Sequence, residues 1–205
     1  MSGSDAVGLE NMRGLLPARL FFGAYFVLFL VCAINPYDRS VWWAENSPIL
    51  LLVGVVAWVQ KYHRFSGVSF SLMFCLMALH TIGGHFTFAL VPFDWVTDTF
   101  GFERNHYDRV AHFSVGFWAF PLAEILHRRN LVNTKWILYL FPVFSIVTLA
   151  GAYEVFEWLY AVSADPAAGI AVLGSQGDIW DAQKDILADT LGALVGVSLF
   201  ALVRD

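Results

Sequence analysis

Residues 179–203 read IWDAQKDILADTLGALVGVSLFALV, an apolar run that begins with three regularly spaced aspartates. At a helical rise of about 1.5 Å per residue, this run is long enough to cross a bilayer core of about 30 Å. Asp181, Asp185 and Asp189 are four residues apart, so they share one face of that helix. A charged side chain at bilayer depth costs roughly 2.5–3.5 kcal/mol, so this face must meet other polar groups, water or a bound ion.

The composition of the whole chain is typical of a multi-pass membrane protein. Of its 205 residues, 58% are hydrophobic and 14% are charged, whereas a soluble domain is usually about 45–50% apolar and about 25% charged. The net charge of −5 argues against nucleic-acid binding, which requires a basic surface. We therefore expect membrane lipids, and no nucleic acid, as the surroundings and partners of this protein.

Five further apolar runs accompany the 179–203 segment, which predicts an all-α membrane bundle of about six transmembrane helices. The predicted spans are 15–35, 46–60, 68–91, 108–127, 136–162 and 179–203. These runs are too long and too continuous for the strands of a membrane β-barrel, which are short and alternate in hydrophobicity. We expect residues 15–205 to form a single transmembrane helical domain, preceded by a cytoplasmic tail over residues 1–14.

The basic residues predict that both termini lie on the cytoplasmic side of a bacterial inner membrane. In this N-in/C-in orientation, the cytoplasmic side holds eight of the 12 Lys and Arg residues and the outer side holds four, as the positive-inside rule requires. The apolar run from Leu20 to Ile34 follows two arginines, as in a signal peptide. Because no A-x-A-like cleavage site follows it, we expect a retained first helix.

Four of the predicted helices carry ionisable residues into the same outer half of the bilayer, within about 16 Å of its outer boundary. Asp108 and His112 are four residues apart and therefore share a helix face, and Glu154 and Glu157 share another face at a spacing of three. His80 and His85 are five residues apart, and a kink at Gly83-Gly84 would be needed to bring them together.

Carboxylates and imidazoles from several facing helices are the groups with which helix bundles build metal sites. Oxygen and nitrogen ligands without thiolate suit Zn²⁺, Mn²⁺, Fe²⁺ or Mg²⁺. The predicted metal ligands are His80, His85, Asp108, His112, Asp181, Asp185 and Asp189. Glu154 and Glu157 are the candidate catalytic residues, and Arg109 and Lys184 are the candidate cations for binding a substrate phosphate.

Purely structural roles can also explain parts of this cluster. Asp108 could cap its helix, and Asp189 with His80, at matching depth, could form a buried pair that only fixes helix packing. Gly192 and Gly196 form a G-x-x-x-G pattern, which favours a close helix contact within the bundle over a dimer interface.

Several motifs, taken together, resemble a known family. They are His80-Thr-Ile-Gly-Gly-His85, Tyr107-Asp-Arg-Val-Ala-His112-Phe113, Glu154-Val-Phe-Glu157-Trp158, and Trp180-Asp-x-x-x-Asp-x-x-x-Asp189-Thr-Leu-Gly192-Ala-Leu-Val-Gly196. Their order resembles the bacterial inner-membrane proteins of the YjdF type, a family of unknown function, over about residues 15–203.

A more distant pattern, Asp-x-x-x-His, then Glu, then Asp-x-x-x-Asp-x-x-Gly, is similar to the VanZ-like membrane proteins, which are linked to glycopeptide resistance. That resemblance implies that the motif positions are Asp108, His112, Glu154, Asp185 and Asp189. Asp189 stands where VanZ-like proteins often have Asn, and the motif with the two histidines is additional.

Three classes of function follow from these observations. The first is a metal-dependent membrane hydrolase or transferase that acts on a lipid or lipid-linked substrate at the outer half of the bilayer. The second is a proton-coupled transporter or ion pathway, for which Asp and His chains are common. The third is a non-catalytic membrane scaffold, whose polar cluster could be replaced by apolar residues without loss beyond stability.

Overall fold

The computed structural model describes residues 3–164 and 166–204, with side chains from Pro17 onward. Within these ranges the protein has nine helices and no strand, which confirms the expected all-α class. The helices are α1 (Gly3–Cys32), α2 (Arg39–Val59), α3 (Gly67–His85), α4 (Asp94–Phe100), α5 (Tyr107–Gly116), α6 (Ala119–Arg128), α7 (Lys135–Ser163), α8 (Pro166–Leu173) and α9 (Asp181–Val203).

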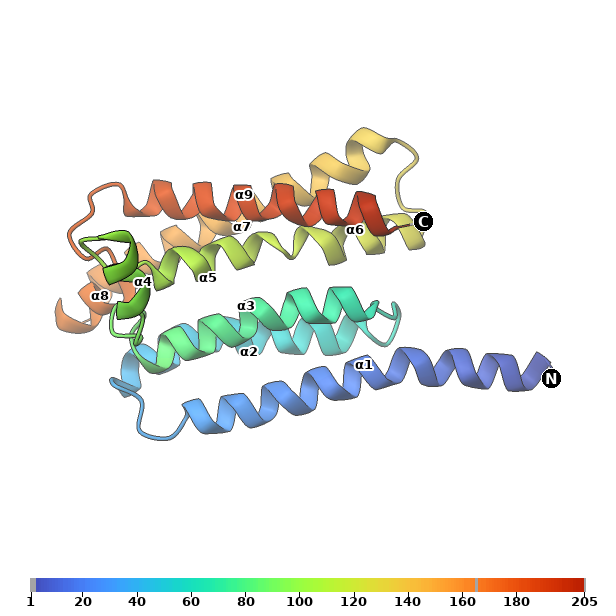
Figure 1. Ribbon diagram of the computed structural model, residues 1–205, viewed down its shortest axis with the longest axis horizontal. Coiled ribbons are helices and arrows are strands. Elements are labelled where there is room, and N and C mark those ends of the chain that lie inside the picture. The colour runs from blue at the N-terminus through green and yellow to red at the C-terminus, as the bar shows by residue number, and fades with distance from the viewer. Residues whose placement is uncertain (1–2, 165, 205) are drawn as a thin grey trace.

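Four of these helices, α2, α3, α7 and α9, are long and apolar enough to cross a membrane. The apolar part of α1, Pro17–Cys32, is shorter. The predicted span 108–127 is divided between α5 and α6, which follow one another end to end (Figure 1). The count of six crossings and the N-in/C-in orientation therefore stay predictions.

Two helix starts differ from the sequence prediction. Helix α2 begins at Arg39 instead of residue 46, because the Asp38 side chain caps it by accepting from the backbone N–H groups of Ser40 and Val41. Helix α1 begins at Gly3, so the backbone of the predicted tail is helical from that residue. Residues 1 and 2 of that tail lie outside the described residues.

The break between α5 and α6 has a local cause at Pro121. Proline has no backbone N–H, so the carbonyl of Phe117 cannot receive the usual helical hydrogen bond from it. The N–H groups of Phe117 and Trp118 instead donate three residues back, to the carbonyls of Ser114 (3.2 Å) and Val115 (3.1 Å). The predicted continuous helix over 108–127 is therefore wrong at its centre.

Glycines bring α5 and α9 close together. A Cβ atom on Gly192 would meet the carbonyl of Phe113, and one on Gly116 would meet the backbone of α9. A Cβ on Gly196 would lie 3.1 Å from the carbonyl of Gly116. The G-x-x-x-G pattern therefore serves a close contact within the bundle, as expected.

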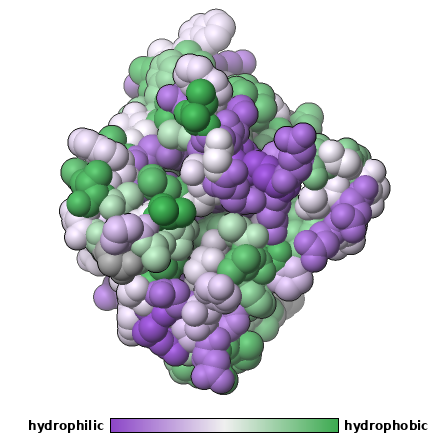
Figure 2. Space-filling model, turned by 90° about the vertical axis from the view of Figure 1, so that its left-hand side faces the viewer, coloured by the Kyte–Doolittle hydropathy of each residue, from purple (hydrophilic) through white to green (hydrophobic). Residues whose placement is uncertain are grey.

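The helices form two groups, with α1, α2 and α3 in one and α5, α6, α7 and α9 in the other (Figure 1). Helix α3 packs against α5 and α6 and so joins the two groups, while α8 packs against both α2 and α7. The short helices α4 and α8 lie at the end where α5 and α9 begin (Figure 1). This end, which we call the outer end after its predicted orientation, mixes hydrophilic and hydrophobic side chains on its face (Figure 2).

Candidate metal centre

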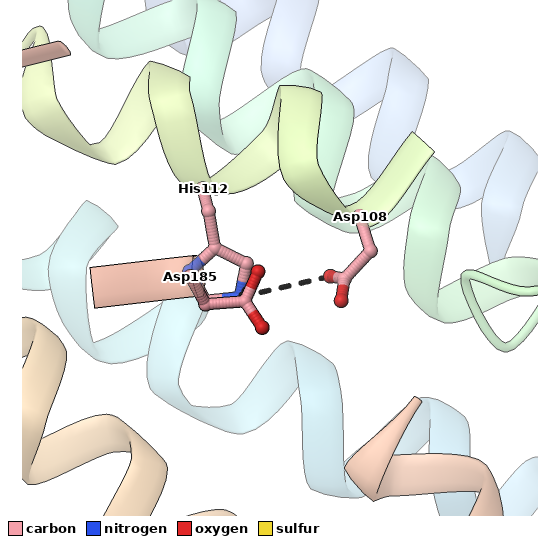
Figure 3. A group of neighbouring side chains, drawn as sticks. All are labelled: Asp108, His112 and Asp185. Carbon is pink, nitrogen blue, oxygen red and sulfur yellow. Dashed lines mark ion pairs between the residues drawn. The ribbon is translucent and has the colours of Figure 1, made fainter. Parts of the chain in front are cut away.

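Asp108 and His112 of α5 meet Asp185 of α9 near the outer end (Figure 3). One potential ligand atom from each of the three residues lies within 4.8 Å of the other two. The Nε2 atom of His112 is 3.6 Å from Asp108 Oδ1 and 3.7 Å from Asp185 Oδ1. All three side chains are buried. We call these three residues the triad.

The second ring nitrogen of His112 is held by Asp189. Its Nδ1 atom lies 3.2 Å from Asp189 Oδ2, where an Nδ1–H group can donate to the carboxylate. In that tautomer the lone pair of Nε2 faces Asp108 and Asp185, the two carboxylates of the triad. A carboxylate behind the imidazole is the usual partner of a metal-ligating histidine, because it fixes the ring's orientation. The other oxygen of Asp189, Oδ1, is buried and has no hydrogen-bond partner among the described residues.

Two arginines hold the aspartates of α9 from the outer side. Arg109 donates to Asp185 and to Asp181. Arg104 also binds Asp181, with Nη1 2.6 Å from Oδ1, and it donates to the carbonyl of Ser175 at 3.0 Å. Asp181 is therefore part of an ion-pair network beside the triad, and Arg104 was not among the predicted site residues.

The two cations predicted to bind a phosphate already have acidic partners. The guanidinium of Arg109 forms ion pairs with Asp181 and Asp185 of α9. The Nζ atom of Lys184 lies 2.6 Å from Asp178 Oδ2 on the exposed surface. That contact, together with the backbone N–H of Trp180, holds the pKa of the Asp178 carboxyl below its usual range.

A second buried polar cluster joins α2, α3 and α7. The Nε2 atom of His80 lies 3.1 Å from Glu45 Oε2, and the Tyr153 hydroxyl donates to the same oxygen at 2.9 Å. His80 therefore pairs with Glu45, and the structure does not show the expected pair with Asp189. His85 lies apart from both clusters, with its Nδ1 atom 2.8 Å from the carbonyl of Cys32.

Sequence reasoning missed Glu45 and Tyr153. Glu45 falls one residue before the predicted start of its span, at residue 46, and it was not among the candidate site residues. The Asp38 cap was the signal that would have placed it inside α2. Tyr153 stands four residues before Glu157, and this helical spacing places both on the same face of α7.

A cavity of about 250 Å³ lies between these two clusters. Its polar lining residues are His80, Asp108, His112, Tyr153, Glu157 and Asp189. The remaining lining residues are apolar and come mainly from α2, α5 and α7. Glu157 is buried and faces this cavity, whereas Glu154 is half-buried and does not line it.

The chain matches known proteins over almost its whole length. Residues 17–205 match the family described as "Predicted membrane protein (DUF2238)". The chain is also 28% identical over 177 residues to "Inner membrane protein YjdF" of Escherichia coli (strain K12), which covers 85% of this chain and 84% of that protein. No solved structure matches the chain. The sequence resemblance to YjdF-type proteins is confirmed, and the more distant one to VanZ-like proteins stays a prediction.

Proposed function

The chain belongs to the DUF2238 family and is a multi-pass protein of the inner membrane. We propose that it is a metal-dependent membrane enzyme. Its substrate would be a lipid or lipid-linked molecule, which it hydrolyses or transfers at the outer half of the bilayer. One observation carries this proposal: a buried carboxylate–imidazole triad contributes two of its members, Asp108 and His112, to the polar end of a largely apolar cavity.

The donor set of the triad suits a divalent cation with oxygen and nitrogen preference, such as Zn²⁺, Mn²⁺, Fe²⁺ or Mg²⁺. Asp108, His112 and Asp185 would be its ligands. Such an ion, when bound, activates water and polarises the bond to be broken. Asp189 would not contact the ion itself but would orient the imidazole of His112. These assignments narrow the predicted ligand set from seven residues to three.

Glu157 is the side chain best placed to act as a general base. It lines the same cavity as Asp108 and His112, and none of the described residues forms a hydrogen bond or ion pair with it. A carboxylate without a partner is free to accept a proton from an attacking water or hydroxyl. Glu154 has a buried oxygen without a hydrogen-bond partner, but it does not line the cavity.

The competing proton pathway lacks a continuation toward the other end of the bundle. Below the polar residues, the cavity is lined by Leu76, Val115, Trp118 and Ile146. A proton relay needs a chain of polar groups or water along its whole length, and this lining would interrupt it.

The proposal is tested on purified protein in liposomes made from a bacterial membrane lipid extract. Mass spectrometry should show loss of one lipid or lipid-linked species with added Mn²⁺ or Zn²⁺, and no loss after treatment with EDTA. Glu157→Gln should lower the rate at least about 100-fold, the usual contribution of general acid–base catalysis, while the exposed control Asp98→Asn should not change it.

Two results would count against these assignments. A rate that is unchanged in EDTA and in folded His112→Ala protein would overturn the metalloenzyme. Loss of activity in Glu154→Gln protein, but not in Glu157→Gln protein, would move the role of general base to Glu154.

A further inference from the structure

The polar and apolar residues of the cavity lie at different depths. Along α7, the apolar lining residue Ile146 comes first, and Tyr153 and Glu157 follow toward the outer end. Along α5, Asp108 and His112 lie at the outer end and Val115 lies deeper. The cavity therefore changes from polar to apolar along the bundle axis, from the outer end toward the middle of the bilayer.

Two lining residues also face outward from the bundle. Leu51 of α2 is 70% exposed and Leu149 of α7 is 59% exposed, although both line the cavity. They therefore form its rim. Helix α2 packs mainly against α3 and α8, and α7 packs mainly against α6, α8 and α9, so the rim lies where α2 and α7 flank the cavity.

The rim lies at the depth of the hydrocarbon core. Leu149 is the middle residue of α7, and Leu51 is two residues, or about 3 Å, from the middle of α2. Both helices are apolar enough to span a membrane. A mouth at this depth, bordered by leucines, opens onto lipid chains and away from the headgroups and water.

The size of the cavity limits what it can hold. The cavity measures about 250 Å³. Ligand pockets usually measure about 300–1,000 Å³. This cavity therefore fits a segment of one hydrocarbon chain, and the rest of a lipid would stay in the bilayer outside the rim.

From these observations we infer that the ligand is a lipid of the outer leaflet that enters sideways between α2 and α7. The first part of one acyl or prenyl chain occupies the apolar end of the cavity, and the polar linkage lies against Asp108 and His112. A lipid of the outer leaflet is oriented in the same way as the cavity, because its polar group is outermost and its chain points toward the bilayer centre. This inference rests on the proposed lipid substrate and adds the route and the bound part of the molecule.

The test uses photoreactive lipids with a diazirine on the first half of the chain, one a phosphatidylglycerol and one a polyprenyl phosphate. Each is reconstituted with the full-length protein, irradiated, and mapped by peptide mass spectrometry. We expect label from at least one probe on interior residues such as Leu76, which is 4% exposed. Label from both probes confined to outward-facing residues such as Phe144, which is 62% exposed, would overturn the inference.

A matched pair of variants tests the same claim from inside the cavity. Ala150 lines the cavity and is 4% exposed, whereas Ala152 of the same helix is exposed and does not line it. Ala150→Phe should reduce interior label at least about five-fold because the phenyl ring fills a close-packed space, and Ala152→Phe should leave it unchanged. Equal interior label in both variants would contradict chain binding in the cavity. If Ala150→Phe does not fold, the map of the wild-type protein still gives the answer.

The same labelling separates this inference from the proposed enzyme activity. Interior label in a wild-type protein that binds no metal would leave the lipid site standing and remove the metalloenzyme. Bound metal without interior label would overturn the sideways entry of a lipid but would leave the proposed metalloenzyme standing.

Discussion

Buried carboxylates near opposite ends of the bundle differ in how many of their oxygens have hydrogen-bond or ion-pair partners. Near the inner end, Glu124 of α6 accepts from the backbone N–H and hydroxyl of Ser66, at 2.9 and 2.7 Å, and from the hydroxyl of Ser69. Arg128 lies 2.8 Å from its Oε1 atom. This glutamate joins α6 to the start of α3, and its contacts account fully for its burial.

Two buried carboxylates near the outer end, Asp189 and Glu157, lack some or all of these partners among the described residues. Asp189 is completely buried, yet in the part of the chain that the structure describes one of its oxygens has no hydrogen-bond partner. Glu157 faces the cavity, without a hydrogen bond or ion pair to any described residue. An unsatisfied buried polar group needs an explanation such as a strain reservoir, a catalytic role or a bound ion. Burial alone therefore does not indicate a functional site. A buried carboxylate beside a cavity, with oxygens that have no hydrogen-bond or ion-pair partner, does indicate one.

The largest effect on stability is expected at the inner end. Glu124→Ala leaves the N–H group of Ser66 and two hydroxyls without an acceptor, so the free energy of unfolding should fall by about 3 kcal/mol. Unfolding followed in detergent measures this loss. Arg128→Ala removes a partner that is 53% exposed, and it should cost no more than about 1 kcal/mol.

Glu124→Ala protein that still folds should keep its full metal content. Metal loss in that variant would mean that the two ends of the bundle do not have separate roles.

The next effect concerns the glycines that bring the triad together. Gly192→Ala places a methyl group against the carbonyl of Phe113, and such overpacking costs about 1–3 kcal/mol. It should also weaken metal binding, because it moves α9 away from α5. Gly151→Ala is the control, since nothing lies within 4 Å of a Cβ atom there.

Unfolding curves and metal titrations of both glycine variants provide the comparison. Equal stability and equal metal affinity in the two variants would show that close packing of α5 on α9 is not what positions the triad.

A smaller effect is expected when only the charge behind His112 is removed. Asp189→Asn keeps the size of the side chain and can still accept a hydrogen bond, but the imidazole becomes a poorer ligand. Loss of such a partner typically lowers metal affinity about 10–100-fold, which competition with a chelator can measure. The stability of the metal-free protein should not fall, because a buried charge with one unused oxygen is removed. Unchanged affinity would show that the negative charge of Asp189 does not strengthen His112 as a ligand.

The smallest effect is expected at Asp178, a partly exposed carboxylate whose pKa is lowered by Lys184 and by the N–H of Trp180. A lowered folded-state pKa adds stability above the usual value of 3.8, and this stability is lost as the pH falls through the lowered pKa. Asp178→Asn should therefore lower the melting temperature slightly at pH 6, and by less at pH 3. A larger loss at pH 3 would contradict this sign.

Much of the site could be predicted because helical spacing and hydrophobicity are local properties of a sequence. The four-residue spacing of Asp108 and His112 placed them on one face of their helix, and the same spacing placed Asp185 with Asp189. The membrane context then implied that these faces must meet. The structure brings Asp108, His112 and Asp185 together.

The features that the sequence did not predict depend on where helices begin and end and on which side chains of other helices pair with them. The start of α2 was placed too late, so Glu45 was lost from the interior. The break between α5 and α6 was missed because the apolar run continues through it. No spacing rule could assign His80 of α3 to Glu45 of α2 in preference to Asp189 of α9, because that choice depends on how α3 packs against the other helices.

The most direct test of the account is the metal content of the detergent-purified protein. It is compared with a folded His112→Ala/Asp185→Ala variant and with a His127→Ala/Asp98→Ala control, which removes the same residue types away from the triad. We predict close to one divalent ion per chain in the wild-type protein and in the control, and almost none in the triad variant. Absence of metal from the wild-type protein after loading with divalent ions, or equal metal in all three proteins, would contradict a metal site at Asp108, His112 and Asp185.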